Sequence, residues 1–252
     1  MVYPVRSNMG KLIISTIKRL LAKCGLVVSR IPTVPNRPSW QRGLLTLKQY
    51  DLVPKTVFDI GVAEGTLDLY TAFPNAKFHL FDPTMESLPH MQAIARVYSA
   101  TVHNFALGCE NGELELKVPF EHCGSTFLEE IGKVEVLRRY TVPVRRFDEV
   151  IQDIERPALA KIDVQGFEIA VLRGMLKKLP DLDAIIVEVS TIATLRDGPE
   201  VAQVMEFFTE HGWSLVDVLS LSARPLDGIL AQMDLLFVPN SSPIRADRRW
   251  QN

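Results

Sequence analysis

The sequence predicts an α/β fold, with a doubly wound, mostly parallel sheet that carries helices on both faces. From residue 56 onward, short apolar runs alternate with stretches of helical periodicity, which is typical of such a sheet. Polar residues, several of them acidic, follow the apolar runs and would lie where an open sheet binds its ligands. The last two apolar runs, 213–219 and 234–238, are separated by a polar turn, which predicts an antiparallel final strand.

Composition is that of a globular protein with one large core. The chain has 252 residues, of which 47% are hydrophobic and 23% are charged. Its three cysteines, Cys24, Cys109 and Cys123, form neither a CxxC pair nor an even disulfide framework, so we expect free thiols in the reducing cytoplasm. No two histidines have metal-ligand spacing, and no metal site is predicted. His122, beside Cys123, is the least ordinary of them.

The amino-terminal region is basic, because no acidic residue precedes Asp51. Residues 11–31 predict an amphipathic helix, which Lys18, Arg19 and Lys23 prevent from spanning a membrane. Two interpretations stay open. The helix lies on an anionic membrane surface, at the inner face of the membrane, or it packs against the domain or against a partner chain, as in a homo-oligomer. A basic head on an acidic body does not predict nucleic-acid binding.

Three segments are expected in order along the chain. Residues 1–39 comprise this amino-terminal helical extension and a proline-rich linker. Residues 40–240 form the main domain, which begins with a short helix at 40–50, and residues 241–252 form a polar tail.

In the first half of the main domain, the pattern predicts strands that alternate with helices. Strands are expected at 56–60, 77–81, 101–106 and 113–118, and helices at 65–73 and after Ser87, which would cap a helix with Pro89 in its first turn. Asn111-Gly112 predicts a hairpin turn, so the strand at 113–118 would be a β insertion in the sheet. Residues 119–138 are expected to form a mobile loop over the site.

The second half continues the alternation. Pro143 predicts an edge strand at 141–144, because proline cannot donate into a ladder. Core strands are expected at 158–162 and 184–188, and helices at 147–154, 167–179 and 199–211.

Candidate site residues follow from this arrangement, because ligands bind outside the carboxyl ends of the strands. The polar or small residues at these ends are Asp59, Gly61, Glu64 and Gly65 after the first strand, Asp82 after the second, Asn104 and Ala106 at the third, Asp163 after the fourth and Glu188 at the fifth.

The loop chemistry favours a cationic cofactor. A carboxylate at Asp82 can accept the hydroxyls of a ribose, which suits nicotinamide dinucleotides and adenosyl cofactors alike. However, the loop after the first strand reads G-V-A-E-G rather than G-x-G-x-x-G, with acid where a pyrophosphate needs bare amides. S-adenosylmethionine carries a sulfonium and an ammonium group, so it fits this acidic loop better than a diphosphate does.

Seven segments together resemble the FkbM family of S-adenosylmethionine-dependent methyltransferases. They are VFDIGVAEG, FHLFDP, HNFALGCENGELEL, GSTFLEE, TVPVRRFDEV, LAKIDVQGFEIAVLRG and IIVEVS, within residues 56–238. The resemblance implies a Rossmann-like class I methyltransferase fold and methyl transfer, usually to a sugar-type hydroxyl of a glycan or natural product. The chain departs from the family at Ala63, where Asn is frequent, and at Gln165, where Glu is frequent. The second departure argues against a base or metal ligand at 165.

The resemblance also implies roles for the candidate residues. Asp59, Gly61, Glu64 and Gly65 would bind the methionine part of the cofactor, Asp82 the ribose, and Ala106 with Asn104 the adenine. Asp163 would lie at the reactive end, although Asp-x-x-Gly before a helix is also a common N-cap. Glu188 is either functional or a buried structural acceptor. Glu168 is expected only to favour its helix dipole.

The leading hypothesis is an O-methyltransferase acting on a saccharide or a saccharide-bearing lipid. Attack by a hydroxyl on a sulfonium needs a base, for which Asp163 is the first candidate and Glu188 the second. The alternatives are a methyltransferase of a small natural product, a scaffold module that keeps the fold without turnover, and, more distantly, a nicotinamide oxidoreductase.

Overall fold

The computed structural model describes residues 37–132 and 135–250. No helix within these residues is long and apolar enough to cross a membrane. The predicted basic helix at 11–31 and most of the linker lie outside the described residues, so both predictions stay untested. The helix expected at 40–50 is confirmed as α2 (Trp40–Gln49), where the Ser39 side chain accepts a hydrogen bond from the backbone N–H of Arg42.

Seven strands form the central sheet in the order β3-β2-β1-β7-β8-β10-β9. Their bounds are β1 (Thr56–Ile60), β2 (Lys77–Phe81), β3 (Ala100–His103), β7 (Ala158–Ile162), β8 (Ala184–Ser190), β9 (Trp213–Ala223) and β10 (Leu230–Pro239). The first five strands of this order pair in parallel, and β10 runs antiparallel to both β8 and β9. The predicted sheet is therefore confirmed, and strand order reverses between β1 and β7.

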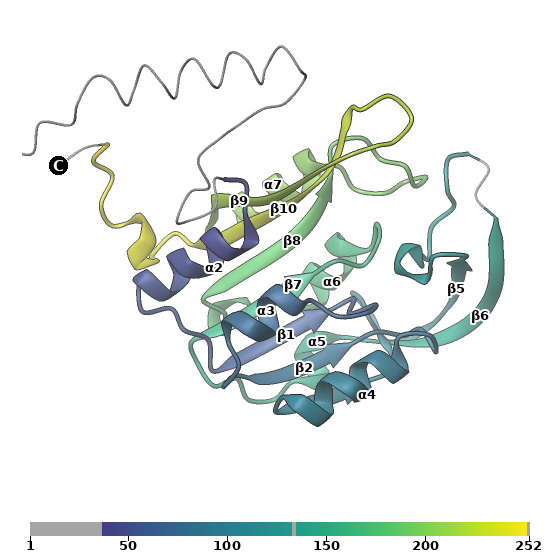
Figure 1. The fold of residues 1–252 in the computed structure, drawn as a ribbon, viewed down its shortest axis with the longest axis horizontal. Helices are drawn as coiled ribbons and strands as arrows, with labels where there is room; N and C mark the ends of the chain where they lie inside the picture. Colours follow the sequence, from purple (N-terminus) through teal and green to yellow (C-terminus); the bar gives the residue numbers. More distant parts are fainter. Residues whose placement is uncertain (1–36, 133–134, 251–252) are drawn as a thin grey trace, which may run out of the picture. The chain divides into compact units, whose positions relative to one another are not determined.

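Helices cover both faces of this sheet (Figure 1). The α2 helix, α3 (Leu67–Ala72) and α4 (Leu88–Val97) pack on one face, and α5 (Phe147–Val150), α6 (Glu168–Gly174) and α7 (Val201–Glu210) pack on the other. Alternation along β1 divides the core, because Val57 contacts the first set while Phe58 and Ile60 contact the second. All five residues of β1 are buried, as expected for a central strand.

A second, three-stranded sheet has the order β4-β6-β5, with β4 (Ala106–Leu107), β5 (Gly112–Pro119) and β6 (Val136–Arg145). The strand expected at 101–106 is therefore two strands in different sheets. The predicted hairpin at Asn111-Gly112 is wrong, because β5 pairs with β6 rather than with the strand before it. The Asn111 side chain instead accepts a hydrogen bond from the backbone N–H of Arg146 and donates one to the Glu149 side chain. These bonds hold the segment before β5 against the segment that follows β6.

The strand that contains Pro143 is central rather than an edge. Proline is tolerated there because β4 pairs only with Val144 and Arg145, so only β5 lies beside Pro143. Ser87 precedes α4 but does not cap it. Its backbone is already helical, and its hydroxyl accepts a hydrogen bond from the Thr84 hydroxyl.

Two helices are shorter than predicted. The helix expected at 147–154 ends at Val150, and the one expected at 167–179 comprises α6 and a separate 3₁₀ turn, Leu179–Asp181. Gly174 ends α6 where the chain passes close to the small sheet, since a Cβ there would lie 2.1 Å from the carbonyl oxygen of Gly108.

Candidate active site

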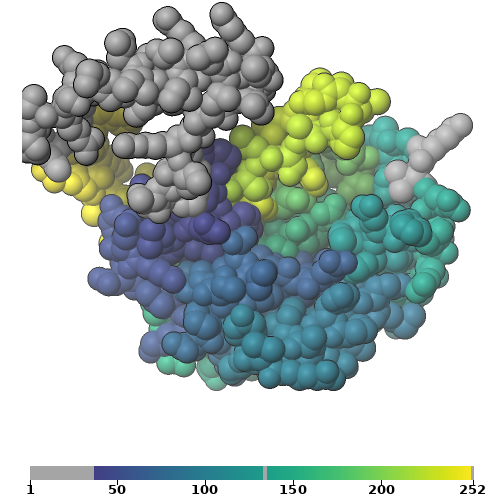
Figure 2. Space-filling model, in the orientation of Figure 1, coloured from purple at the N-terminus to yellow at the C-terminus, as the bar shows by residue number. Residues whose placement is uncertain are grey.

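Two neighbouring cavities open at the carboxyl ends of the parallel strands, beside the switch between β1 and β7. The first has a volume of about 240 Å³ and combines a polar part with an apolar part, which contains Ala106, Leu107, Leu116, Phe127 and Phe167. The second is more open and has a volume of about 470 Å³. Segments far apart in the sequence, coloured blue, green and teal, meet on this face of the molecule (Figure 2). The two cavities share the lining residues Gly61, Ala63, Cys123, Asp163 and Glu188.

The loop after β1 is held close to the loop after β7. Gly61 has φ +80°, and a Cβ at this position would lie 1.7 Å from the carbonyl oxygen of Asp163. Only glycine allows this approach and this backbone conformation together. Lys161 reinforces the contact, because its Nζ donates to the Gly61 carbonyl oxygen over 2.6 Å.

Asp59 lies behind this loop, fully buried, and lines neither cavity. It accepts hydrogen bonds from the hydroxyls of Thr66 and Tyr70, and lies 3.5 Å from Lys161 Nζ. Burial raises the pKa of Asp59, while Lys161 opposes the shift. The sequence predicted that Asp59 binds the cofactor; the structure places it where it positions the loop that carries Gly61.

Lys161 is a site residue that the sequence pattern did not reveal. Burial alone would lower the pKa of Lys161, but the carboxylates of Asp163 and Asp59 raise it above its ordinary value, so the ammonium group stays charged. Its Nζ lies 3.4 Å from Asp163 Oδ2. The available signal was a lysine inside the otherwise apolar run 158–162, since a buried lysine needs anionic partners.

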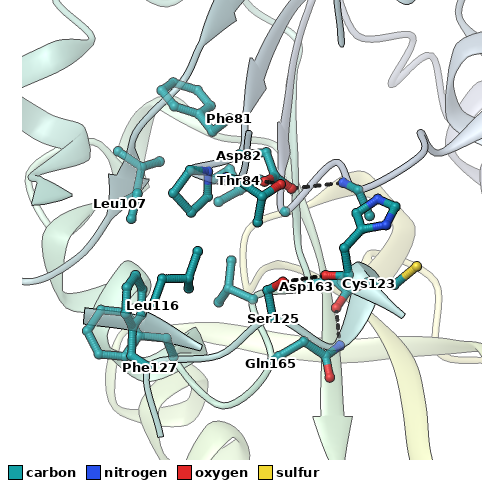
Figure 3. Close-up of a pocket in the computed structure, with 18 of the residues that line it drawn as sticks. Phe81, Asp82, Thr84, Leu107, Leu116, Cys123, Ser125, Phe127, Asp163 and Gln165 are labelled. Atoms are coloured by element: carbon teal, nitrogen blue, oxygen red, sulfur yellow. Dashed lines mark hydrogen bonds between the residues drawn. The ribbon is translucent and has the colours of Figure 1, made fainter. Parts of the chain in front are cut away.

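Asp82 lines the first cavity at the end of β2, opposite Asp163 and Gln165 (Figure 3). Its Oδ1 accepts from the Thr84 backbone N–H at 2.8 Å and from the Thr84 hydroxyl at 2.6 Å, and its Oδ2 accepts from Ala63 N–H at 2.9 Å. A carboxylate has about four acceptor positions. One position therefore remains, on Oδ2, so this carboxylate can accept from one ribose hydroxyl rather than from both.

Asn104 supports Asp82 instead of lining either cavity. Its amide donates to the carbonyl oxygens of Asp82 and Thr84, at 2.8 and 3.1 Å, which fixes the turn after β2. Ala106 does line the first cavity, whereas Glu64 and Gly65 line only the second.

Asp163 and Glu188 are joined by one amide group. Gln165 Nε2 donates to Asp163 Oδ1 at 2.8 Å and to Glu188 Oε2 at 2.9 Å, and Gln232 Nε2 also donates to Glu188 Oε2. Burial raises the pKa of Glu188 to about 9, with a further contribution from the Asp163 carboxylate. Burial therefore favours the protonated form of Glu188.

The alternative that Asp163 is an N-cap is wrong, because α6 has Phe167 at its N-cap position and no side-chain cap there. Glu168, however, does more than favour the helix dipole. Its Oε1 accepts from the backbone N–H groups of Val164 and Gly166, at 3.2 and 3.0 Å, and so shapes the loop after β7.

We expect Glu168→Gln to increase stability above neutral pH. Burial raises the pKa of Glu168 to about 7. A carboxyl whose folded pKa is raised favours folding below its unfolded pKa, and this contribution is lost as pH rises through about 7. Relative to wild type, the variant should gain about 2.5 kcal/mol in free energy of unfolding between pH 5 and pH 8. Urea denaturation at both values measures this; equal pH dependence in the two proteins would contradict it.

The segment predicted as a loop at 119–138 does contact the site. Thr126 donates its hydroxyl to the Gln165 carbonyl oxygen at 2.8 Å, and bridges back to Lys117 in β5. His122, Cys123, Ser125 and Phe127 line the first cavity. Burial raises the pKa of the Cys123 thiol, and so do the nearby carboxylates of Glu64, Glu121 and Asp163.

This fold, with its antiparallel β10 and its cavities at the β1–β7 switch, is that of a class I methyltransferase. The methyltransferase FkbM domain matches residues 59–215. The chain belongs to the FkbM methyltransferase family, which confirms the resemblance seen in the sequence. A search of curated proteins found no match.

Solved structures of methyltransferases are similar at low identity. One is precorrin-6y C5,15-methyltransferase from Geobacter metallireducens GS-15, with 10% identity, TM-score 0.43, and 84% of this chain and 94% of that chain covered. Another is magnesium protoporphyrin IX methyltransferase from Synechocystis PCC 6803 with bound S-adenosylmethionine, with 11% identity, TM-score 0.46, and 94% and 100% covered. A third is 1,6-didemethyltoxoflavin-N1-methyltransferase from Burkholderia thailandensis with bound S-adenosylhomocysteine, with 11% identity, TM-score 0.45, and 95% and 93% covered.

S-adenosylmethionine is the cofactor of this methyltransferase domain, and the first cavity fits it. Asp82 retains an acceptor position for a ribose hydroxyl, the apolar wall suits an adenine ring, and the Asp163 carboxylate suits the cationic end. The two departures from the family both have left-handed backbone, with φ 46° at Ala63 and 48° at Gln165. Asn tolerates this conformation better than Ala, so Ala63 carries strain that the hydrogen bond to Asp82 offsets.

Proposed function

We propose that the protein transfers a methyl group from S-adenosylmethionine to a hydroxyl of a sugar, in a glycan or glycolipid. The observation that carries this proposal is the wall common to both cavities, which contains Asp163 and Glu188. A cofactor in the first cavity and an acceptor in the second would meet at these two side chains. Methyl transfer also requires such a meeting point, because the attacking oxygen, the methyl carbon and the sulfur must be in line.

The lining of the second cavity supports a polyhydroxylated acceptor. Trp40 contributes an aromatic surface, and its Nε1 donates to Asp234 Oδ2 at 2.9 Å, which fixes the indole. Glu64, Asp68 and Asp234 add carboxylates that accept hydrogen bonds from hydroxyl groups. The same carboxylates disfavour anionic acceptors, so we expect a neutral saccharide rather than a phosphorylated one. A small natural product with several hydroxyls is the second candidate.

Side chains of this protein would carry out the proton transfer that attack by a hydroxyl requires. The bound cofactor supplies an electrophilic methyl group on sulfur and leaves as S-adenosylhomocysteine. Asp163, oriented by Lys161 and Gln165, would accept the proton of the attacking hydroxyl, as the new carbon–oxygen bond forms and the carbon–sulfur bond breaks. Glu188, whose pKa is raised by burial, would donate a hydrogen bond to the acceptor in its protonated form rather than act as the base.

The pH profile separates these two roles. If Glu188 acts as a neutral acid, kcat/KM should fall as pH rises through about 9, because the carboxyl then loses its proton. Glu188→Gln keeps a neutral donor and should lose this alkaline decline. Profiles from about pH 7 to about pH 10 measure it. A rate that instead rises through about pH 9, and does so only with Glu188 present, would make Glu188 the base.

Trp40→Ala should raise the KM for a sugar acceptor about 3- to 10-fold, since it removes an aromatic contact without touching the cofactor cavity. The affinity for S-adenosylmethionine, measured by calorimetry, should not change. Trp40→Phe is the matched control. It keeps a ring, loses only the hydrogen bond to Asp234, and should have an intermediate KM.

Release of S-adenosylhomocysteine, measured with a panel of neutral glycans, glycolipids, phosphorylated sugars and small polyphenols, tests the function as a whole. Turnover with neutral sugars supports the proposal, and turnover only with polyphenols favours the natural-product alternative. Cofactor binding without turnover on any acceptor would favour a scaffold. The basic segment 11–31 fits an acceptor assembled at a membrane, and co-sedimentation with anionic vesicles, with and without this segment, tests that part separately.

A further inference from the structure

Three side chains with metal-binding atoms meet at the border of the two cavities. Glu64 comes from the loop between β1 and α3, while His122 and Cys123 come from the 3₁₀ turn His122–Gly124 after β5. One ligand atom from each lies within 4.8 Å of the other two. Ligand atoms around one tetrahedral zinc ion lie about 3–4 Å apart, so small side-chain rotations bring all three to a common ion.

The imidazole of His122 is packed in place, but its hydrogen-bonding capacity is not fully used within the described residues. Its Nε2 is buried and has no hydrogen-bond partner within residues 37–132 and 135–250. The ring stacks on His90, with centroids 6.0 Å apart, and the backbone carbonyl of His122 accepts from Ser125 N–H and from the Ser125 hydroxyl. A buried ring nitrogen without a partner is uncommon in native proteins, and a metal ion is one of its ordinary explanations.

Charge and donor type at the cluster indicate which cation fits. Glu121 and Asp163 add negative charge near Cys123, beyond that of Glu64. Imidazole nitrogen and thiolate sulfur are ligands of zinc and similar borderline cations, whereas magnesium and calcium prefer oxygen. Three protein ligands also leave one position of a tetrahedral ion open.

We propose that Glu64, His122 and Cys123 bind a zinc-type divalent cation. Cys123 lines both cavities, and Glu64 belongs to the same loop between β1 and α3 as Gly61. The ion would therefore join the segment after β5 to the loop between β1 and α3, at the edge of the space where cofactor and acceptor meet.

Metal binding by the full-length protein tests this directly. Protein stripped with a chelator, given ZnCl₂ and desalted should retain about one zinc per chain by mass spectrometry. Cobalt substitution should produce a thiolate-to-cobalt charge-transfer band. Cys123→Ser should abolish this band, and Glu64→Gln should weaken zinc binding at least about 10-fold.

A matched control uses the other thiol within the described residues. Cys109 is exposed and lies outside the cluster, so Cys109→Ser should bind zinc like the wild type. The exposed position of Glu64 makes Glu64→Gln a safe variant if Cys123→Ser fails to fold. Failure of the wild type to retain zinc, or a charge-transfer band that survives in Cys123→Ser, would overturn the proposal.

Discussion

Asp163→Asn should lower kcat by about 10²- to 10⁴-fold at saturating cofactor, and should also weaken binding of S-adenosylmethionine, because the variant loses a negative charge beside the cationic end of the cofactor. The amide keeps the shape of the carboxylate and can still accept from Gln165, but it cannot take a proton from an attacking hydroxyl. Asp163 is the better candidate base because it is partly exposed, with 30% of its side chain accessible, and is paired with Lys161. For Glu188, in contrast, burial raises the pKa and favours the protonated form.

Single-turnover kinetics at saturating cofactor, together with calorimetric titration of the cofactor, measure this prediction. Asp181→Asn is the matched control, since it makes the same change in an exposed carboxylate at 3.9 Å from Lys178, and a surface pair of this kind contributes little. The thermal unfolding of both variants should also be measured, because removing the charge of Asp163 leaves Lys161 with one carboxylate partner fewer. Near-normal turnover in a folded Asp163→Asn variant would remove Asp163 as the base.

Gly61→Ala should destabilise the protein by more than about 4 kcal/mol and abolish cofactor binding. The added methyl group would lie 1.7 Å from the carbonyl oxygen of Asp163, which no side-chain rotation can relieve, and alanine is strained at φ +80°. The ends of β1 and β7 would have to separate. This would also break the hydrogen bond from Lys161 Nζ to the Gly61 carbonyl oxygen.

Gly112→Ala is the control for that variant. A Cβ added at Gly112 would have no heavy atom within 4 Å, and the residue does not have a positive φ, so its replacement should leave both stability and cofactor binding unchanged. Chemical denaturation and a thermal shift with S-adenosylmethionine measure the pair. A Gly61→Ala protein with wild-type stability would show that the two loops are free to separate.

Lys161 links these two predictions, because it contacts both of the loops concerned. Its single ammonium group reaches the Gly61 carbonyl oxygen, Asp59 and Asp163. A shift of the glycine loop would therefore move Lys161 and, with it, Asp163, the candidate base. Buried charges of this kind are costly unless they are paired, and the three anionic or polar partners satisfy that requirement.

Periodicity alone predicted the central sheet well. The strands expected at 56–60, 77–81 and 158–162 have the observed ends, because buried parallel strands are short apolar runs that polar or glycine residues terminate. Local sequence rules predicted the connections between these strands less reliably. Asn111-Gly112 is a favourable hairpin signal, yet β5 has a longer ladder with β6 and pairs there instead.

The amino-acid sequence by itself determined the fold class, the family and the strand ends from which the site is built, since each depends on local periodicity or on a contiguous motif. Only the tertiary structure decided which polar residues face the cavities. It placed Asp59 and Asn104 behind the loops and brought Trp40, Cys123 and Glu188 to the second cavity. It also showed that Gln165 bridges Asp163 and Glu188. These contacts join residues distant in the chain, and their geometry depends on how the strands and loops pack, which no local pattern encodes.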